Sequence, residues 1–129
     1  MKAELQAAHD AQMSVMPQSD PVVEGFDISG ICIPANEVGG DFFDFFWLNE
    51  KQTRFGMAIG DVSGKAMRAA MIAVMSSGMI YSEADETFSP RAAMTRLNRP
   101  MLLKTDEYTF IALLLAALDV KTKTMTFSN

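Results

Sequence analysis

Two short segments place an aspartate beside glycines, and their residue types could bind a metal ion. Residues 37–41 read Glu-Val-Gly-Gly-Asp, and residues 60–65 read Gly-Asp-Val-Ser-Gly-Lys. Glycine lets the backbone turn sharply and approach a ligand closely. Carboxylate oxygens without histidine or cysteine are the donors that suit Mg²⁺ or Mn²⁺. Two such ions sharing a carboxylate could activate a water against phosphate, so these segments favour phosphoryl hydrolysis.

The two aspartates follow the pattern of a β-hairpin. Residues 41–48 are rich in phenylalanine, residues 49–52 are turn-like, and residues 54–59 are again extended in pattern. Asp41 and Asp61, which are 20 positions apart, would then lie at the two open ends of one hairpin. Two ionised carboxylates held together repel, and a cation between them relieves that repulsion. Spacing alone leaves open a simpler reading, because Asp-Gly pairs also mark ordinary tight turns.

The N-terminal residues predict a short amphipathic helix over 3–16, which Pro17 ends. Its stripe, at alternating steps of three and four, consists of Leu5, Ala8, Gln12 and Val15. A narrow stripe with a glutamine at one seam position favours docking on a partner helix, although a frayed surface helix is the alternative.

The central elements are predicted from apolar patterning and from turn residues. A linker at 18–21 precedes a predicted first strand over 26–33. Residues 66–80 carry almost no charge, which is typical of a helix largely buried against a sheet. Ser89 and Pro90 are a plausible N-cap and first residue of a second helix.

The C-terminal third predicts the end of that helix and two further strands. We expect Pro100 to kink or end the helix, because proline cannot donate the intrahelical hydrogen bond. Residues 108–118 form an apolar run that context favours as a strand, and residues 125–127 begin one more. Together the elements predict an α+β fold.

Composition excludes several classes of protein. With 129 residues and 49% hydrophobic content, the chain can bury one sizeable core. The net charge of −5, without a dense run of lysine or arginine, argues against nucleic-acid binding. Cys32 and His9 lack neighbours at zinc-ligand spacing, so both are interpreted as ordinary residues. Without a signal-peptide pattern or a membrane-spanning stretch, we expect a cytoplasmic protein with no membrane partner.

Three ordered segments resemble the SpoIIE/RsbU-type branch of the PPM serine/threonine phosphatases. Residues 8–17 resemble the helix that precedes the domain, residues 37–46 its first motif, and residues 60–71 its second. The resemblance implies part of a four-layer α-β-β-α sandwich preceded by a linker helix. It divides the chain into a linker or switch helix at 1–20 and a C-terminally truncated phosphatase domain at 21–129.

The same resemblance implies a ligand set. Asp41 and Asp61 match metal ligands of the family, with Asp61 bridging two ions of Mn²⁺ or Mg²⁺, and the carbonyl of Val62 contributes to the cluster. Glu37 is expected to support the site, together with Gly40 and Gly60. No side chain is implied as a nucleophile, because the family uses a metal-bound water. One departure is Ala66, where the family usually has glycine.

The resemblance also implies a substrate and partners. The expected activity removes phosphate from phosphoserine or phosphothreonine in a regulatory protein of the anti-anti-sigma type. The N-terminal helix would join an upstream sensor or receiver domain. The alternative is a catalytically incomplete fragment or a binding module of the same fold, because the later aspartates of the family are absent. In that case, exposed apolar strands after Tyr108 would favour a homodimer.

Overall fold

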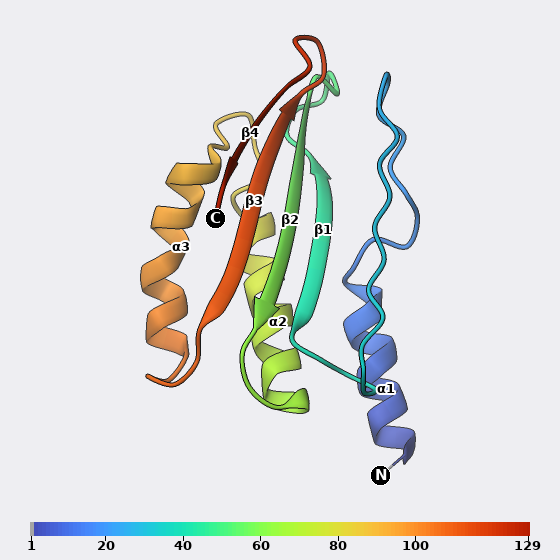
Figure 1. Ribbon diagram of the computed structural model, residues 1–129, viewed down its shortest axis with the longest axis vertical. Coiled ribbons are helices and arrows are strands. Elements are labelled where there is room, and N and C mark those ends of the chain that lie inside the picture. The colour runs from blue at the N-terminus through green and yellow to red at the C-terminus, as the bar shows by residue number, and fades with distance from the viewer. Residues whose placement is uncertain (1) are drawn as a thin grey trace.

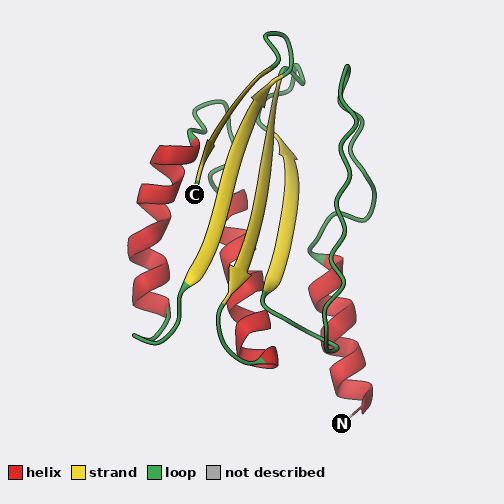
Figure 2. Cartoon of the chain, in the orientation of Figure 1, coloured by secondary structure: helices red, strands yellow, loops and turns green. Residues whose placement is uncertain are grey.

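The fold is a single antiparallel sheet with helices on one face, in a computed structural model that describes residues 2–129. The first residue of the predicted 1–20 segment lies outside this range. The elements are α1 (Lys2–Ser14), β1 (Asp41–Trp47), β2 (Arg54–Val62), α2 (Ala66–Tyr81), α3 (Pro90–Lys104), β3 (Ile111–Asp119) and β4 (Thr124–Ser128). The strand order is β1-β2-β3-β4, and Figures 1 and 2 show this arrangement. The predicted α+β class is confirmed.

Two helices cover one face of the sheet. Helix α2 packs on β1 and β2, and α3 packs on β3 and β4, so each helix covers two strands. In Figure 1, α2 lies behind the sheet. Alternate residues of the strands point into this layer, and Phe42, Phe46 and Leu115 are buried there. No helix within residues 2–129 is long and apolar enough to cross a membrane.

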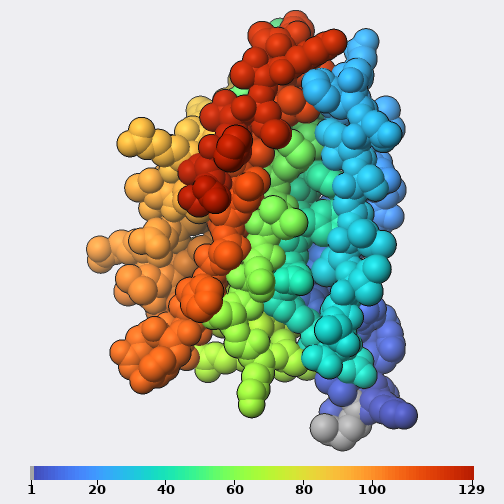
Figure 3. Space-filling view, in the orientation of Figure 1, coloured from blue at the N-terminus to red at the C-terminus, as the bar shows by residue number. Residues whose placement is uncertain are grey.

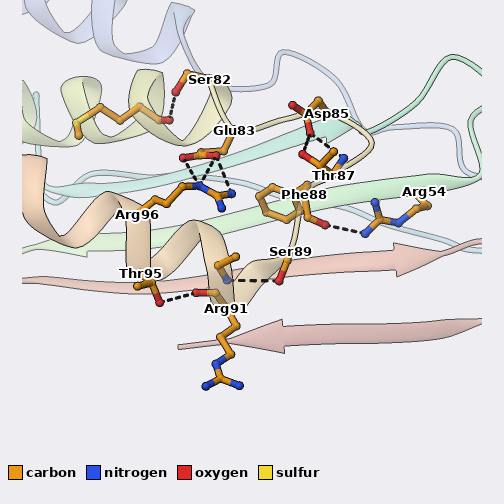
Figure 4. Close-up of polar contacts among 12 residues, drawn as sticks. Arg54, Ser82, Glu83, Asp85, Thr87, Phe88, Ser89, Arg91, Thr95 and Arg96 are labelled. Atoms are coloured by element: carbon orange, nitrogen blue, oxygen red, sulfur yellow. Dashed lines mark hydrogen bonds and ion pairs between the residues drawn. The ribbon is translucent and has the colours of Figure 1, made fainter.

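The connection between α2 and α3 is fixed to the sheet by an arginine. The guanidinium of Arg54, at the start of β2, donates hydrogen bonds of 2.8 Å to the carbonyls of Glu86 and Phe88. Figure 4 shows the bond to Phe88. A salt bridge of 3.0 Å joins Glu83, in this connection, to Arg96 on α3. These contacts hold the side chain of Phe88 in the core, where it is 2% exposed.

The predicted strand over 26–33 is wrong. The structure gives this stretch only an isolated bridge between Val23 and Phe26, around Gly25 with a φ of +82°. The side chains of Phe26 and Ile28 instead pack against the cluster around Phe55, on the sheet face away from α2 and α3. Its apolar pattern therefore reflects packing on the sheet and not pairing within it. Figure 3 shows the segment between α1 and β1 lying along the side of the sheet.

Pro100 was expected to kink or end its helix. It does not end the helix, because α3 continues to Lys104. A proline removes one intrahelical hydrogen bond, and burial on either side can offset that cost. Leu97 and Met101 both lie in the core. The predicted start is confirmed, with Pro90 in the first turn and the side chain of Ser89 accepting a hydrogen bond as the N-cap.

The other face of the sheet remains partly open. A groove of about 1010 Å³ runs over it, and its lining includes Ile59, Leu114, Met125 and Phe127. Ile59 is 59% exposed and Phe127 is 61% exposed, although both are large apolar side chains. A β-sandwich covers such a face with a second sheet. In the four-layer fold that the resemblance implies, residues 2–129 would form one sheet and one helical layer.

The helix-facing core predicts a clear difference between two phenylalanines. Phe88→Ala should lower the free energy of unfolding by about 3–5 kcal/mol, because it removes a buried ring 5.7 Å from the ring of Phe46. Phe127→Ala, on the exposed face, should change it by less than about 0.5 kcal/mol. Urea unfolding measures both, and equal losses would contradict this assignment of the core.

Candidate metal site

The register of the first hairpin brings two carboxylates together. Strands β1 and β2 pair antiparallel, and Asp41 lies directly opposite Asp61 at the open end. Asn49 closes the other end, where its side chain binds Thr53 by hydrogen bonds of 2.7 and 3.0 Å. The predicted hairpin and the proximity of its two aspartates are therefore confirmed. Their role as ligands stays a prediction.

The electrostatics of the pair favour a bound cation. The pKa of Asp41 is raised, first by partial burial and then by the negative charge of Asp61 and a hydrogen bond between the two side chains. In the folded chain, the charge of Asp61 therefore disfavours the ionised form of Asp41. A divalent cation between them would remove that effect.

The loop before β1 packs against the backbone carbonyl of Val62, which lies beside the two aspartates. The amide of Val62 donates a 3.0 Å hydrogen bond to the carbonyl of Gly40. A side chain on Gly40 would overlap the carbonyl oxygen of Val62, so only glycine permits this approach. Gly64 has a φ of +108°, which also favours glycine, whereas Ala66 begins α2 and has no positive φ. The family departure at Ala66 is thus compatible with the backbone.

Two other predicted residues have different places. A side chain on Gly60 would overlap the ring of Phe42, so this glycine serves the packing of the hairpin. Glu37 does not line the cleft around the aspartates, and its backbone carbonyl is bound by Nδ1 of His9. The structure therefore gathers Asp41, Asp61 and Val62 but does not bring the carboxylate of Glu37 to them.

Two residues beside the pair were not predicted to belong to the site. A cleft of about 220 Å³ next to Asp41 and Asp61 is lined in part by Gln12 and Cys32. The thiol of Cys32 donates to the backbone carbonyl of Asp41 at 3.7 Å, and burial, followed by the charge of Asp41, raises the pKa of the thiol. Nothing in local spacing links positions 12 and 32 to the motifs, because only the folded chain places them together.

The donor set fits a hard divalent cation only in part. Within residues 2–129, no group of three or more histidine, cysteine, aspartate or glutamate side chains is arranged to hold a metal ion. Two carboxylates and one carbonyl have the right chemistry, since Mg²⁺ and Mn²⁺ bind oxygen donors. Both ions prefer about six ligands, so water or further residues would have to complete the coordination.

Solved structures identify the class of fold. The chain is similar to the SiaA-PP2C domain of Pseudomonas aeruginosa, with a TM-score of 0.66 at 15% identity over 98% of this chain and 52% of that one. It is also similar to the PP2C phosphatase domain of SpoIIE from Bacillus subtilis, with a TM-score of 0.59 at 20% identity over 70% of this chain and 26% of that one. The architecture is thus that of a PP2C-type phosphatase domain.

Sequence comparison identifies the family. The model of the family "Stage II sporulation protein E (SpoIIE)" matches residues 51–129. Phosphoserine phosphatase RsbU of Bacillus subtilis is 26% identical over 129 residues, and protein IcfG of Synechocystis is 30% identical over 86 residues, or 67% of this chain. The chain belongs to the SpoIIE family. It spans 38% of the length of RsbU and 13% of the length of IcfG.

The close approach at Gly40 predicts an unusual pair of stability effects. Gly40→Ala should lower the free energy of unfolding by about 1–3 kcal/mol, because the added methyl group meets the carbonyl of Val62. Gly78→Ala places the same methyl group in open space on α2 and should stabilise the fold by about 0.5–1 kcal/mol. Urea unfolding with a chelator measures both, and a neutral Gly40→Ala variant would refute the approach.

The raised pKa of Asp41 predicts a pH-dependent effect of its removal. The folded chain holds a proton on Asp41 more tightly than the unfolded chain, so this group makes folding less favourable as the pH rises through its folded pKa. Without metal, Asp41→Asn should therefore be more stable than wild type at about pH 7, and this gain should disappear near pH ~3. Urea unfolding in a chelator at both pH values measures it, and a variant less stable than wild type at neutral pH would contradict the raised pKa of Asp41.

Proposed function

We propose that residues 21–129 are the N-terminal part of a metal-dependent serine/threonine protein phosphatase domain, and that residues 1–20 are its linker helix. The observation that carries the proposal is the register that sets Asp41 opposite Asp61, with the carbonyl of Val62 beside them. Membership of the SpoIIE family supports the same activity. Because this chain is shorter than its relatives, metal binding and turnover by these 129 residues are themselves part of the proposal.

The proposed chemistry assigns each residue one task. Asp41 and Asp61 would hold Mn²⁺ or Mg²⁺, with two ions sharing Asp61, and the carbonyl of Val62 would add a neutral oxygen donor. Such ions supply a nucleophile from water at neutral pH and neutralise the charge that develops on the phosphate. Gly40 keeps the loop close to Val62, and no side chain acts as the nucleophile.

The proposed substrate is a phosphorylated regulatory protein of the anti-anti-sigma type, in a cytoplasmic signalling system. Support comes from the relative named phosphoserine phosphatase RsbU and from a solved structure of the RsbU and RsbW domains of Rv1364c of Mycobacterium tuberculosis. The latter has a TM-score of 0.54 at 19% identity over 68% of this chain and 24% of that one. We also propose that α1 connects the domain to an upstream sensor or receiver domain.

A second function is favoured by a specific observation. Among residues 2–129, the candidate site has only two carboxylates, and a large apolar face of the sheet is uncovered. A chain in this state would serve as a binding module without turnover, and a second copy could cover the open face as a homodimer. Catalysis separates the two functions.

Hydrolysis of p-nitrophenyl phosphate and of a phosphoserine peptide tests the proposal. We expect turnover that requires Mn²⁺, and Asp61→Asn should lower it at least about 100-fold, because metal ions contribute several kcal/mol to such reactions. Asp44→Asn is the matched control, because it also replaces an aspartate with asparagine. Asp44 lies on β1 at a position that points to the helix side, so this variant should retain turnover. A folded wild-type chain without Mn²⁺-dependent turnover would exclude catalysis by this chain and support the binding module.

A further inference from the structure

Helix α1 is attached directly to the loop that precedes Asp41. The side chain of Gln12 is only 4% exposed, and both ends of its amide bind one residue of that loop. Its Nε2 donates to the carbonyl of Gly39 at 2.6 Å, and its Oε1 accepts from the amide of Gly39 at 3.2 Å. Nδ1 of His9, one turn earlier on the helix, contacts the carbonyl of Glu37. The helix therefore binds the loop backbone at two points.

These bonds continue to the candidate site through the backbone. Gly39 is followed by Gly40, whose carbonyl accepts the hydrogen bond from the amide of Val62. The next residue is Asp41, opposite Asp61 in the register. The path from Gln12 to the two carboxylates thus consists of one side chain, two glycines and one hydrogen bond across the hairpin. Two adjacent glycines form a flexible link, because glycine has more accessible backbone conformations than other residues.

A buried glutamine needs a reason, because an amide removed from water costs free energy unless its hydrogen bonds are replaced. Met13 on α1 and Met16, which follows the helix, pack into the main core and would seat the helix without a buried polar residue beside them. An apolar side chain at position 12 would meet the same packing requirement. The amide adds the ability to hold one peptide group by its N–H and its C=O at once.

We propose that Gln12 is a positioning residue, which fixes the Gly39–Gly40 backbone and thereby holds Asp41 and the carbonyl of Val62 at the same cleft, where they would bind a cation. This inference rests on the proposed metal site and gives it a control point outside the catalytic motifs. Any force that turns or withdraws α1 breaks both bonds to Gly39 and frees the loop. Affinity for the metal then depends on the placement of the helix.

The test compares Gln12→Met with wild type by amide hydrogen exchange and by Mn²⁺ binding. Methionine keeps the length and apolar contacts of the side chain but lacks the amide. We expect the amides of Gly39 and Val62 to exchange about tenfold faster or more, while the amide of Leu115 in β3 stays protected. The dissociation constant for Mn²⁺ should rise by about tenfold, a size found when residues that orient metal ligands are removed.

Gln6→Met is the matched control, because Gln6 is exposed on α1 and, within residues 2–129, its side chain bonds only to Asp10. It should leave exchange and Mn²⁺ binding unchanged. Unaltered protection of Val62 in Gln12→Met would overturn the proposal, and so would a loss of protection that is equal across the sheet, which marks a merely structural residue. If the wild-type chain binds no Mn²⁺, the proposed function fails, and the exchange of Val62 still decides whether Gln12 positions the loop.

Discussion

The repulsion between two carboxylates at one end of a hairpin is the constraint on which the rest of the structure depends. An antiparallel ladder places Asp41 opposite Asp61, and nothing in the ladder itself favours that pairing. Burial raises the pKa of Asp41 first, and the negative charge of Asp61 raises it further. Protein folds keep such arrangements where function requires them, because strain and perturbed charges concentrate at functional sites.

The surrounding elements hold this register against the repulsion. Phe42 and Phe46, on the helix side of β1, are buried against α2, so a slip of one residue would expose both rings. Gly40 admits the carbonyl of Val62, and Gln12 binds Gly39, the preceding residue of the loop. The helical layer, the glycine pair and α1 thus all contact the end of the hairpin where Asp41 faces Asp61. The opposite face of the sheet remains available for the second sheet of a four-layer sandwich.

Much of the fold followed from local patterns in the sequence. The phenylalanine-rich stretch at 41–48, the capping pair at Ser89 and Pro90, and the uncharged stretch at 66–80 each reflect a local preference that the tertiary structure reinforces. Residues 26–33 have strand-like alternation, but Phe26 and Ile28 pack across the sheet face. Sequence alone cannot separate packing on a sheet from pairing within it. Pro100 was misjudged because burial of Leu97 and Met101 outweighs a local helix-breaking preference.

The site could be predicted only as far as the motifs reach. The two aspartates were found because one hairpin connects them, which makes their proximity a local property. Gln12 and Cys32 were not assigned to the site, because their places beside it depend on long-range packing of α1 and of the segment before β1. Glu37 lies within the first motif, yet the turn directs its carbonyl to His9 and leaves its side chain outside the cleft.

Electron paramagnetic resonance of Mn²⁺, titrated with the wild-type chain and with a variant carrying both Asp41→Asn and Asp61→Asn, tests the central claim most directly. The signal of the free hexaaquo ion falls when the ion is bound, so the titration counts bound ions without requiring turnover. A carboxylate pair that shares a cation predicts saturable binding by the wild-type chain and none at this site in the variant. Equal binding by the two folded proteins would contradict a metal site at the end of the hairpin.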